Sequence, residues 1–398
     1  MKKLLPLLVF TFISFQFKSQ TAVSIANGNW TNPLTWNCTC IPTTGYSVTI
    51  NNNVTLNTSM VFSSGGITIN NTGSLIQDAS NNRDIWINGG YFNNNGTANF
   101  RYFLVSAGTL TNTGSYTVVA MTNSVAFTNS GTIKMDSMYV SGNLINAASG
   151  KIIGDSLTNG AGVTLTNNGR MMITAQTNSG TVNNNNYIDG YYYTNSGVFN
   201  NNDSLMLTAS LWNRTVFNNN GGGRVRLGKN FHNYHPSKTA VFDNNSNVIV
   251  LDSWYNTDTV KGGLNGYFQV ADTSANSGFM KGNFMFCDMT PPPSMPKVDF
   301  NSGTISPGIT YCTVGIDEKE LSALNVYPNP SNGTFYIKTD KLTEYIVTIS
   351  DLTGKVVFEK MISSNESVYF TQADGMYMMK VTDPQSGASG IKKLIIQH

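Results

Sequence analysis

The chain has 398 residues and a formal net charge of +2, with 24 Lys and Arg against 22 Asp and Glu. This balance excludes a strong electrostatic attraction to nucleic acid or to an anionic membrane. Charged residues make up only 12% of the chain, and Asn, Thr, Ser and Gly are abundant instead. Such a composition favours turns and short strands over long helices. We expect no cofactor and no nucleic-acid partner.

The first residues have the pattern of a secretory signal peptide. Lys2 and Lys3 precede an apolar stretch at residues 4–17, and a small residue, Ser19, follows it. A membrane anchor is the alternative, but the stretch is shorter than the ~20 residues that a spanning helix needs. We therefore predict a signal peptide at residues 1–19 and an exported mature chain.

Four cysteines in an exported chain predict disulfides. They are Cys38, Cys40, Cys287 and Cys312, and they allow three connectivities. We favour Cys287–Cys312, because that bridge closes a short loop around a Pro-rich segment. Cys38–Cys40 is then a tight local bridge.

Residues 20–59 differ from the chain that follows. Trp30 and Trp36 are large apolar residues in a polar segment, and we expect them to pack over the start of the next structure. The segment resembles the opening of many exported Bacteroidetes repeat proteins, in which it leads into a β-helix. We predict an N-terminal cap segment here.

Residues 60–314 are repetitive. Short runs of alternating apolar residues are joined by an Asn/Ser/Thr-Gly step, and most of these glycines lie roughly 17 to 24 residues apart. That spacing suits one coil of a parallel β-helix, with about three short strands joined by turns at which Gly accepts a positive φ. The glycines of the clearest copies are Gly73, Gly114, Gly131, Gly169, Gly197 and Gly303.

The β-helix also makes a geometric prediction. Alternating pairs such as Ile67 with Ile69 and Val248 with Val250 should point inward and stack. Stacked Asn side chains can form hydrogen-bonded ladders along the coil axis. A two-sheet sandwich or a propeller built from the same strands is the alternative. We predict an all-β chain with a parallel β-helix-like body.

Residues 324–398 carry more charge than the repeats, and residues 315–323 are predicted to be a linker. Three segments of this region, with a Pro-Asn-Pro entry, an Asp-Leu-Thr-Gly-Lys turn and a Gly-Met-Tyr strand, resemble the type A C-terminal sorting domain of the Bacteroidetes type IX secretion system. The matching positions are Tyr327, Pro328, Asn329, Pro330, Gly333, Asp351, Gly354, Lys355, Gly375, Tyr377 and Lys380.

The resemblance implies a partner and a destination. The partner is the type IX secretion machinery, which carries the body across the outer membrane and usually removes the sorting domain. The body is then released or attached to surface lipopolysaccharide. About seven short strands in this region independently predict a small immunoglobulin-like antiparallel sandwich.

Two motifs resemble catalytic blocks. Residues 154–157 match the Gly-Asp-Ser-Leu block of GDSL-type esterases, in which Ser156 would be the nucleophile. That family needs a His three residues after an Asp, and this chain has none, so we interpret the block as a turn. Residues 256–258 resemble one block of β-helical pectin hydrolases, but the other carboxylates are missing, and Glu is absent before Glu318.

Two further groups of residues are candidate binding sites. His232 and His235 could supply metal ligands, but on a strand they would face opposite sides, and we expect no metal. Residues 191–193 are three tyrosines that could stack on sugars, although packing is the preferred interpretation. We expect a structural or adhesin-like surface protein and no enzyme. The alternative is a non-catalytic carbohydrate-binding β-helix, and a polysaccharide-degrading enzyme is less favoured.

Asp followed by Ser or Thr and then an aliphatic residue or Met resembles the O-glycosylation signal of exported Bacteroidetes proteins. It predicts glycans at Ser137, Ser156, Ser204 and Thr259, with chance occurrence as the alternative. Asp and Ser favour turns, so we expect these hydroxyls to point outward.

The sorting assignment generates a first prediction. Deleting residues 324–396 should trap the protein in the periplasm of its native host, because the machinery would no longer recognise it. Immunoblotting of periplasmic and surface fractions measures this. Normal surface delivery of the truncated chain would contradict the assignment.

Overall fold

A computed structural model describes residues 20–237, 239–290, 297–312, 324–339, 344–363, 366–384 and 388–398. The chain divides into two compact units, residues 1–312 and 313–398. The predicted signal peptide at 1–19 and the predicted linker at 315–323 lie outside the described residues. In the described part, no helix is long and apolar enough to cross a bilayer.

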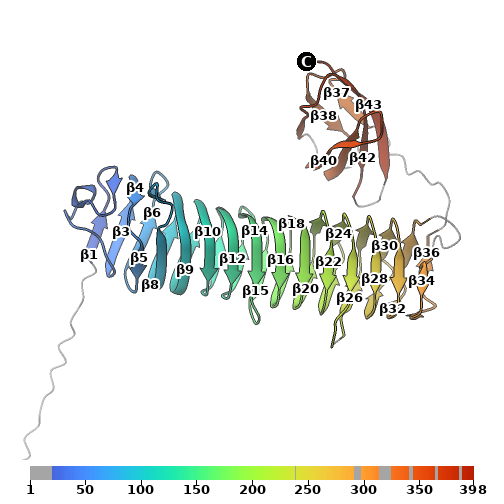
Figure 1. The fold of residues 1–398 in the computed structure, drawn as a ribbon, viewed down its shortest axis with the longest axis horizontal. Coiled ribbons are helices and arrows are strands. Elements are labelled where there is room, and N and C mark those ends of the chain that lie inside the picture. The colour runs from blue at the N-terminus through green and yellow to red at the C-terminus, as the bar shows by residue number, and fades with distance from the viewer. Residues whose placement is uncertain are drawn as a thin grey trace, which may run out of the picture. The chain divides into compact units, whose positions relative to one another are not determined.

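The first unit is a parallel β-helix, which confirms the predicted fold (Figure 1). Each strand pairs in parallel with its equivalent one coil later, mostly three strands further along, so a coil contributes three strands. The strands in order are β1 (Gln20–Val23), β2 (Gly28–Asn29), β3 (Tyr46–Ile50), β4 (Asn53–Leu56), β5 (Met60–Phe62), β6 (Gly66–Ile69), β7 (Ser74–Gln77), β8 (Asp84–Asn94), β9 (Thr97–Asn112), β10 (Ser115–Asn123), β11 (Phe127–Asn129), β12 (Thr132–Val140), β13 (Leu144–Asn146), β14 (Lys151–Asn159), β15 (Thr164–Asn167), β16 (Arg170–Asn178), β17 (Thr181–Asn184) and β18 (Tyr187–Gly190).

The remaining strands of the β-helix are β19 (Tyr192–Asn195), β20 (Val198–Asn201), β21 (Ser204–Leu207), β22 (Leu211–Asn213), β23 (Val216–Asn219), β24 (Arg224–Leu227), β25 (Phe231–Asn233), β26 (Val241–Asn244), β27 (Asn247–Val250), β28 (Trp254–Asn256), β29 (Thr259–Gly262), β30 (Tyr267–Val270), β31 (Ser274–Asn276), β32 (Phe279–Gly282), β33 (Met285–Asp288), β34 (Phe300–Asn301), β35 (Thr304–Ile305) and β36 (Thr310–Tyr311).

Three parallel sheets form the faces of the β-helix. We call them the A face, from β1 through β3 and β6 to β35, the B face, from β2 through β4 and β7 to β36, and the C face, from β5 to β34. The longer strands turn a corner, so β14 pairs on the B face at its start and on the C face at its end. Every strand therefore has an inward and an outward set of side chains.

The inward side chains form one continuous apolar core. Ile67, Ile69, Val248 and Val250 are fully buried, as predicted. Aromatic rings stack at the coil spacing along the A face, with centroid separations of 4.6 Å and 4.7 Å between successive members of the set Phe199, Phe217 and Phe242. Burial of one coil thus depends on the coil on each side of it.

Two ladders of asparagine side chains run through the interior. In each, the Nδ2 atom donates to the Oδ1 atom of the equivalent Asn one coil later, at 2.7–2.9 Å. The A-face ladder comprises Asn94, Asn112, Asn129, Asn146, Asn167, Asn184, Asn201, Asn219 and Asn244. The C-face ladder comprises Asn159, Asn178, Asn195, Asn213, Asn233, Asn256, Asn276 and Asn301.

Each ladder begins with an oxygen that accepts no hydrogen bond. Among the described residues, the Oδ1 atoms of Asn94 and Asn159 are buried without a partner. The reason is the register, because the preceding coil places Ile69 and Val140 at the equivalent positions. An aliphatic residue supplies no donor, so the ladder cannot extend toward the N-terminus.

The repeated glycines have a different role from the one expected. Gly114 and Gly131, like the other glycines of the clearest copies, do not have positive φ angles. A Cβ atom at Gly131 would instead collide with the backbone oxygen of Gly114 one coil earlier. The turns stack so closely that only Gly fits, so close approach explains the repeat.

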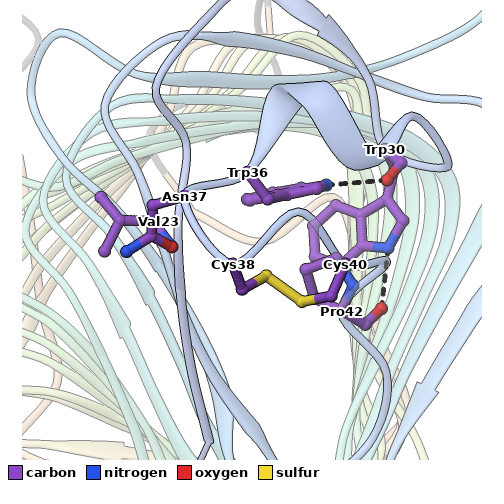
Figure 2. Close-up of a disulfide and its surroundings, with 7 residues drawn as sticks. All are labelled: Val23, Trp30, Trp36, Asn37, Cys38, Cys40 and Pro42. Atoms are coloured by element: carbon purple, nitrogen blue, oxygen red, sulfur yellow. Dashed lines mark hydrogen bonds between the residues drawn. A yellow bond between two sulfur atoms is a disulfide. The ribbon is translucent and has the colours of Figure 1, made fainter.

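The N-terminal segment at residues 20–59 supplies the first strands of the same sheet, and a short 3-10 helix, η1 (Pro33–Thr35), lies within it. Trp30 and Trp36 are both buried, and their rings meet edge to face at 4.9 Å. The Trp36 indole donates to the Trp30 carbonyl, and the Trp30 indole donates to the Pro42 carbonyl (Figure 2). Trp30 also contacts Phe62 in the core, so the pair packs over the first coils as expected.

Both disulfides form as favoured from the sequence. Cys38 is joined to Cys40 beside the tryptophan pair (Figure 2). Cys287 is joined to Cys312 across a sequence separation of 25 residues. The second bridge ties β33 to the end of the β-helix and links the last coil to an earlier one.

The second unit is a small antiparallel sandwich, as predicted. Its two sheets enclose a shared core that includes Phe335, Val347 and Leu394. One sheet has the order β37 (Asn325–Tyr327), β38 (Thr334–Lys338), β41 (Ser367–Tyr369), and the other has the order β40 (Val356–Ser363), β39 (Glu344–Ser350), β42 (Gly375–Thr382), β43 (Ser389–Ile396).

The ladders generate a prediction about stability. Replacing Asn201 by Ala should lower the free energy of unfolding by about 1–3 kcal/mol for each buried group left unpaired, because Asn184 loses its acceptor and Asn219 its donor. The matched control is Asn202→Ala. Asn202 also makes two side-chain bonds to stacked asparagines, but it is exposed.

Urea unfolding followed by circular dichroism measures both variants. The control should stay within about 0.5 kcal/mol of the wild type, because water replaces the lost bonds. Equal losses in the two variants would show that the buried ladder has no special role.

Candidate functional site

A column of aromatic side chains lies on the outside of the C face. Strands β22, β25, β28, β31 and β34 have an inward residue, an outward residue and then the ladder Asn where the strand is complete. The outward residues are therefore in register from coil to coil. In order along the axis, they are Trp212, His232, Tyr255, Ala275 and Phe300, which we call the C-face column.

The first three rings of the column are stacked. Trp212 and His232 have centroids 3.8 Å apart with planes 13° from parallel, and His232 and Tyr255 follow at 5.1 Å and 13°. The imidazole is half-buried between its neighbours, and this burial lowers the pKa of His232 from its usual value of 6.5. The neutral imidazole is therefore the form that the stack holds at neutral pH.

The column is interrupted at Ala275. A hollow of about 440 Å³ opens there, and we call it the Ala275 hollow. The Tyr255 ring lies one coil before it, and Phe300, whose side chain is 67% exposed, lies one coil after it. A methyl group thus occupies the level at which the neighbouring coils carry rings.

Hydroxyl side chains also line the Ala275 hollow. They belong to Thr257, Ser277 and Ser302, which are exposed and each follow a ladder Asn.

Asp299 and Asn301 flank Phe300 and are level with the buried Ser274 and Asn276, so their side chains face inward. The Oδ2 atom of Asp299 accepts a hydrogen bond from the Ser274 amide at 3.0 Å, and Asn301 ends the C-face ladder by accepting from Asn276 at 2.7 Å. The hollow therefore combines apolar walls with hydroxyl groups.

The residues of the esterase-like block do not assemble a catalytic site. Ser156 lies within β14, where the strand bends from the B face to the C face, and not in the tight turn expected. Four coils separate it from His232 along the C face, which corresponds to roughly 19 Å at the usual strand spacing. A general base must lie within hydrogen-bond reach of its nucleophile, and this one does not.

The Asp of the pectinase-like block and the two histidines make contacts that do not form a catalytic or metal site. The Asp258 carboxylate accepts from the backbone amide of His235 at 2.7 Å, and the His235 ring accepts from the Ser237 amide. His232 and His235 do not converge on one point, because His232 is in the aromatic stack. Within the described ranges, no group of three or more His, Cys, Asp or Glu side chains could hold a metal ion.

The tyrosine run is divided between solvent and core. Tyr191 and Tyr192 are each 44% exposed and have ring centroids 5.6 Å apart, whereas Tyr193 is buried. Only part of the run can meet a ligand, as the strand alternation predicts.

The four candidate glycosylation sites differ in exposure. Ser137 is exposed and Ser156 is half-buried, and they are register partners on adjacent coils. Ser204 and Thr259 are only 2% and 9% exposed, so the expectation that their hydroxyls point outward is wrong. Both residues begin strands that pack on the core, and the Ser204 hydroxyl donates to Asp203.

In the second unit, the predicted motif residues hold turns and strand ends. The Asp351 Oδ1 atom accepts from the amides of Thr353 and Lys355, and the turn closes at Gly354 with φ of 86°. The hydrogen bond from the Thr353 hydroxyl, together with those from the Thr353 and Lys355 amides, lowers the pKa of Asp351, because these bonds stabilise the carboxylate.

The Pro-Asn-Pro entry is tied to the last strand of the same unit. The Asn329 side chain donates to the Lys393 carbonyl at 2.7 Å and accepts from the Ile395 amide at 2.9 Å. Gly333 has a φ of 95°, which favours Gly at that turn. The Tyr377 hydroxyl donates to the Ala373 carbonyl. Gly375, Tyr377 and Lys380 all lie in β42.

These features define a protein with a parallel β-helix body and a small C-terminal antiparallel sandwich. Residues 325–397 match the family described as the secretion system C-terminal sorting domain. This confirms the predicted sorting domain and its partner, the type IX secretion machinery. The protein is therefore exported to the cell surface or secreted.

One curated relative was also found. An ulvan lyase from Nonlabens ulvanivorans is 31% identical over 74 residues, which is 18% of this chain. The chain spans only 14% of the length of that relative.

The half-buried histidine predicts a pH dependence. Because the pKa of His232 is lowered in the folded state, the unfolded chain binds more protons, and stability falls as pH drops below about 6.5. Lowering the pH from about 7.5 to about 5.5 should therefore decrease the urea concentration at the unfolding midpoint, and the decrease should be larger in the wild type than in His232→Gln. The same pH dependence in both proteins would contradict a buried neutral imidazole.

Proposed function

We propose that the body is a non-catalytic, adhesin-like rod that the type IX system displays on the cell surface or releases. The observation that carries this proposal is the stack of paired strands from β1 to β36, with amide ladders through its middle coils, joined to a sorting domain. A closed, closely packed stack presents long, regular outer faces, which suits attachment better than chemistry that needs a moving lid.

The arrangement of reactive groups supports the non-catalytic part of the proposal. Glycoside hydrolysis usually uses two carboxyl groups that flank the scissile bond, and a calcium-dependent lyase would need a cluster of Asp and Glu side chains. In the described part of the body, Asp258 is bonded to a backbone amide and Ser156 lacks a neighbouring base. Surface lipopolysaccharide remains a proposed partner through the sorting pathway.

Carbohydrate binding without catalysis is a second candidate function. The outward rings of Tyr255 and Phe300, on either side of the Ala275 hollow, favour it, because aromatic faces pack on the apolar faces of sugars. The two candidate functions are compatible, since an adhesin can attach through sugars.

The proposal predicts attachment without turnover. Full-length protein incubated with ulvan and other algal and plant polysaccharides should release no reducing ends and no unsaturated products absorbing in the ultraviolet. Ser156→Ala should leave any ester hydrolysis at the background level of the wild type.

Cells that lack the protein should attach less to polysaccharide-coated surfaces. Product release that requires the body would overturn the proposal.

A further inference from the structure

We propose that the Ala275 hollow is a binding slot for one pyranose ring of gluco configuration, held between Tyr255 and Phe300 as the missing member of the C-face column. This inference rests on the proposed non-catalytic function and names its ligand class.

The first argument is the orientation of the Tyr255 ring. It lies 13° from parallel with His232, which in turn lies 13° from parallel with Trp212. The three stacked rings fix each other's orientation, with their planes nearly parallel to one another. One face of Tyr255 is covered by His232, and the opposite side faces the coil of Ala275. The slot therefore has a rigid, pre-oriented aromatic wall.

The second argument is the spacing. Tyr255 and Phe300 lie two coils apart with Ala275 between them, which is ~9–10 Å at the usual strand spacing. A ring at the middle level would lie ~4.5–5 Å from each wall, within the contact range of stacked rings. The core of the A face already contains rings stacked at this spacing, because the ring centroids of Phe199 and Phe217 are 4.6 Å apart.

The third argument is the chemistry of the rim. Thr257, Ser277 and Ser302 are exposed and line the same hollow beside Tyr255, Ala275 and Phe300. A ligand with an apolar ring and hydroxyls at its edge suits two aromatic walls bordered by a row of hydroxyl groups.

Two aromatic walls also select among sugars. A gluco-configured pyranose has all its hydroxyls equatorial, so C–H groups point to both of its faces and hydroxyls point only to the rim. A galacto-configured ring carries one axial hydroxyl, which would press against Tyr255 or Phe300 without a hydrogen-bond partner. The slot should therefore prefer β-linked glucans to β-linked galactans.

The test is binding of cellohexaose, laminarihexaose and a β-1,4-galactan hexaose to the full-length chain, measured by isothermal titration calorimetry. Ala275→Tyr fills the slot and should weaken binding of the glucan at least ten-fold. Phe300→Ala removes one exposed wall and should weaken it several-fold. The matched control is Thr177→Tyr, which adds a ring at an equivalent outward position of the C face several coils away.

The control should bind as the wild type does, and urea unfolding of each variant confirms that it is folded. Wild-type binding retained by Ala275→Tyr, equal binding of galactan, or no binding to any of the three oligosaccharides would overturn the slot. None of these results touches the proposed function if cells still attach through the protein. Degradation of the oligosaccharides during the titration would overturn the proposed function instead.

Discussion

The pairing of each coil with the next is the constraint on which the rest of this β-helix depends. Backbone hydrogen bonds, stacked core side chains and asparagine ladders all connect neighbouring coils in parallel register. A buried Asn is costly unless its amide is satisfied, and here the ladder members after the first are satisfied mainly by their equivalents on the adjacent coils. The same register also aligns the outward residue that precedes each ladder Asn. The side chains of the C-face column therefore lie one above another from coil to coil.

The glycines express the same constraint at the corners. Gly131 lies so close to Gly114 that a Cβ atom would meet the backbone oxygen of the coil before it. Close stacking at the turns keeps the strand ends aligned. Because the strand ends are aligned, equivalent Asn side chains on successive coils lie within hydrogen-bond distance. Local sequence and coil stacking therefore support each other, which is the consistency expected of a sequence that specifies one fold.

Much of the fold could be predicted from the sequence because its signals are periodic. The Gly spacing indicated one coil, the alternation at Ile67 and Ile69 indicated the inward face, and the Asn-rich turns indicated ladders. The role of the glycines could not be predicted, because a turn that needs a positive φ and a close contact between coils both require Gly, and the sequence does not distinguish the two. The outward placement of Ser204 and Thr259 failed for a related reason, since a turn signal does not tell which strand end packs inward.

The Ala275 hollow was not found from the sequence. Its walls are 45 residues apart, and coils of unequal length separate them. A signal was nevertheless present, because Trp212, His232 and Phe300 each directly precede a ladder Asn. Once the ladder is known, the preceding residue of each coil can be aligned and the interruption at Ala275 becomes visible.

The two ladders cover different lengths of the stack, and this has a mechanical consequence. The A-face ladder ends at Asn244, and the C-face ladder begins at Asn159, so both are present only between these residues. The coils before Asn94 have neither ladder, and the last coils have one. Under tension along the chain, the coils before Asn94 should separate first, whereas the Cys287–Cys312 bridge ties the last coil to the one before it. Resistance to extension should be greatest in the middle coils, where two amide chains must break together.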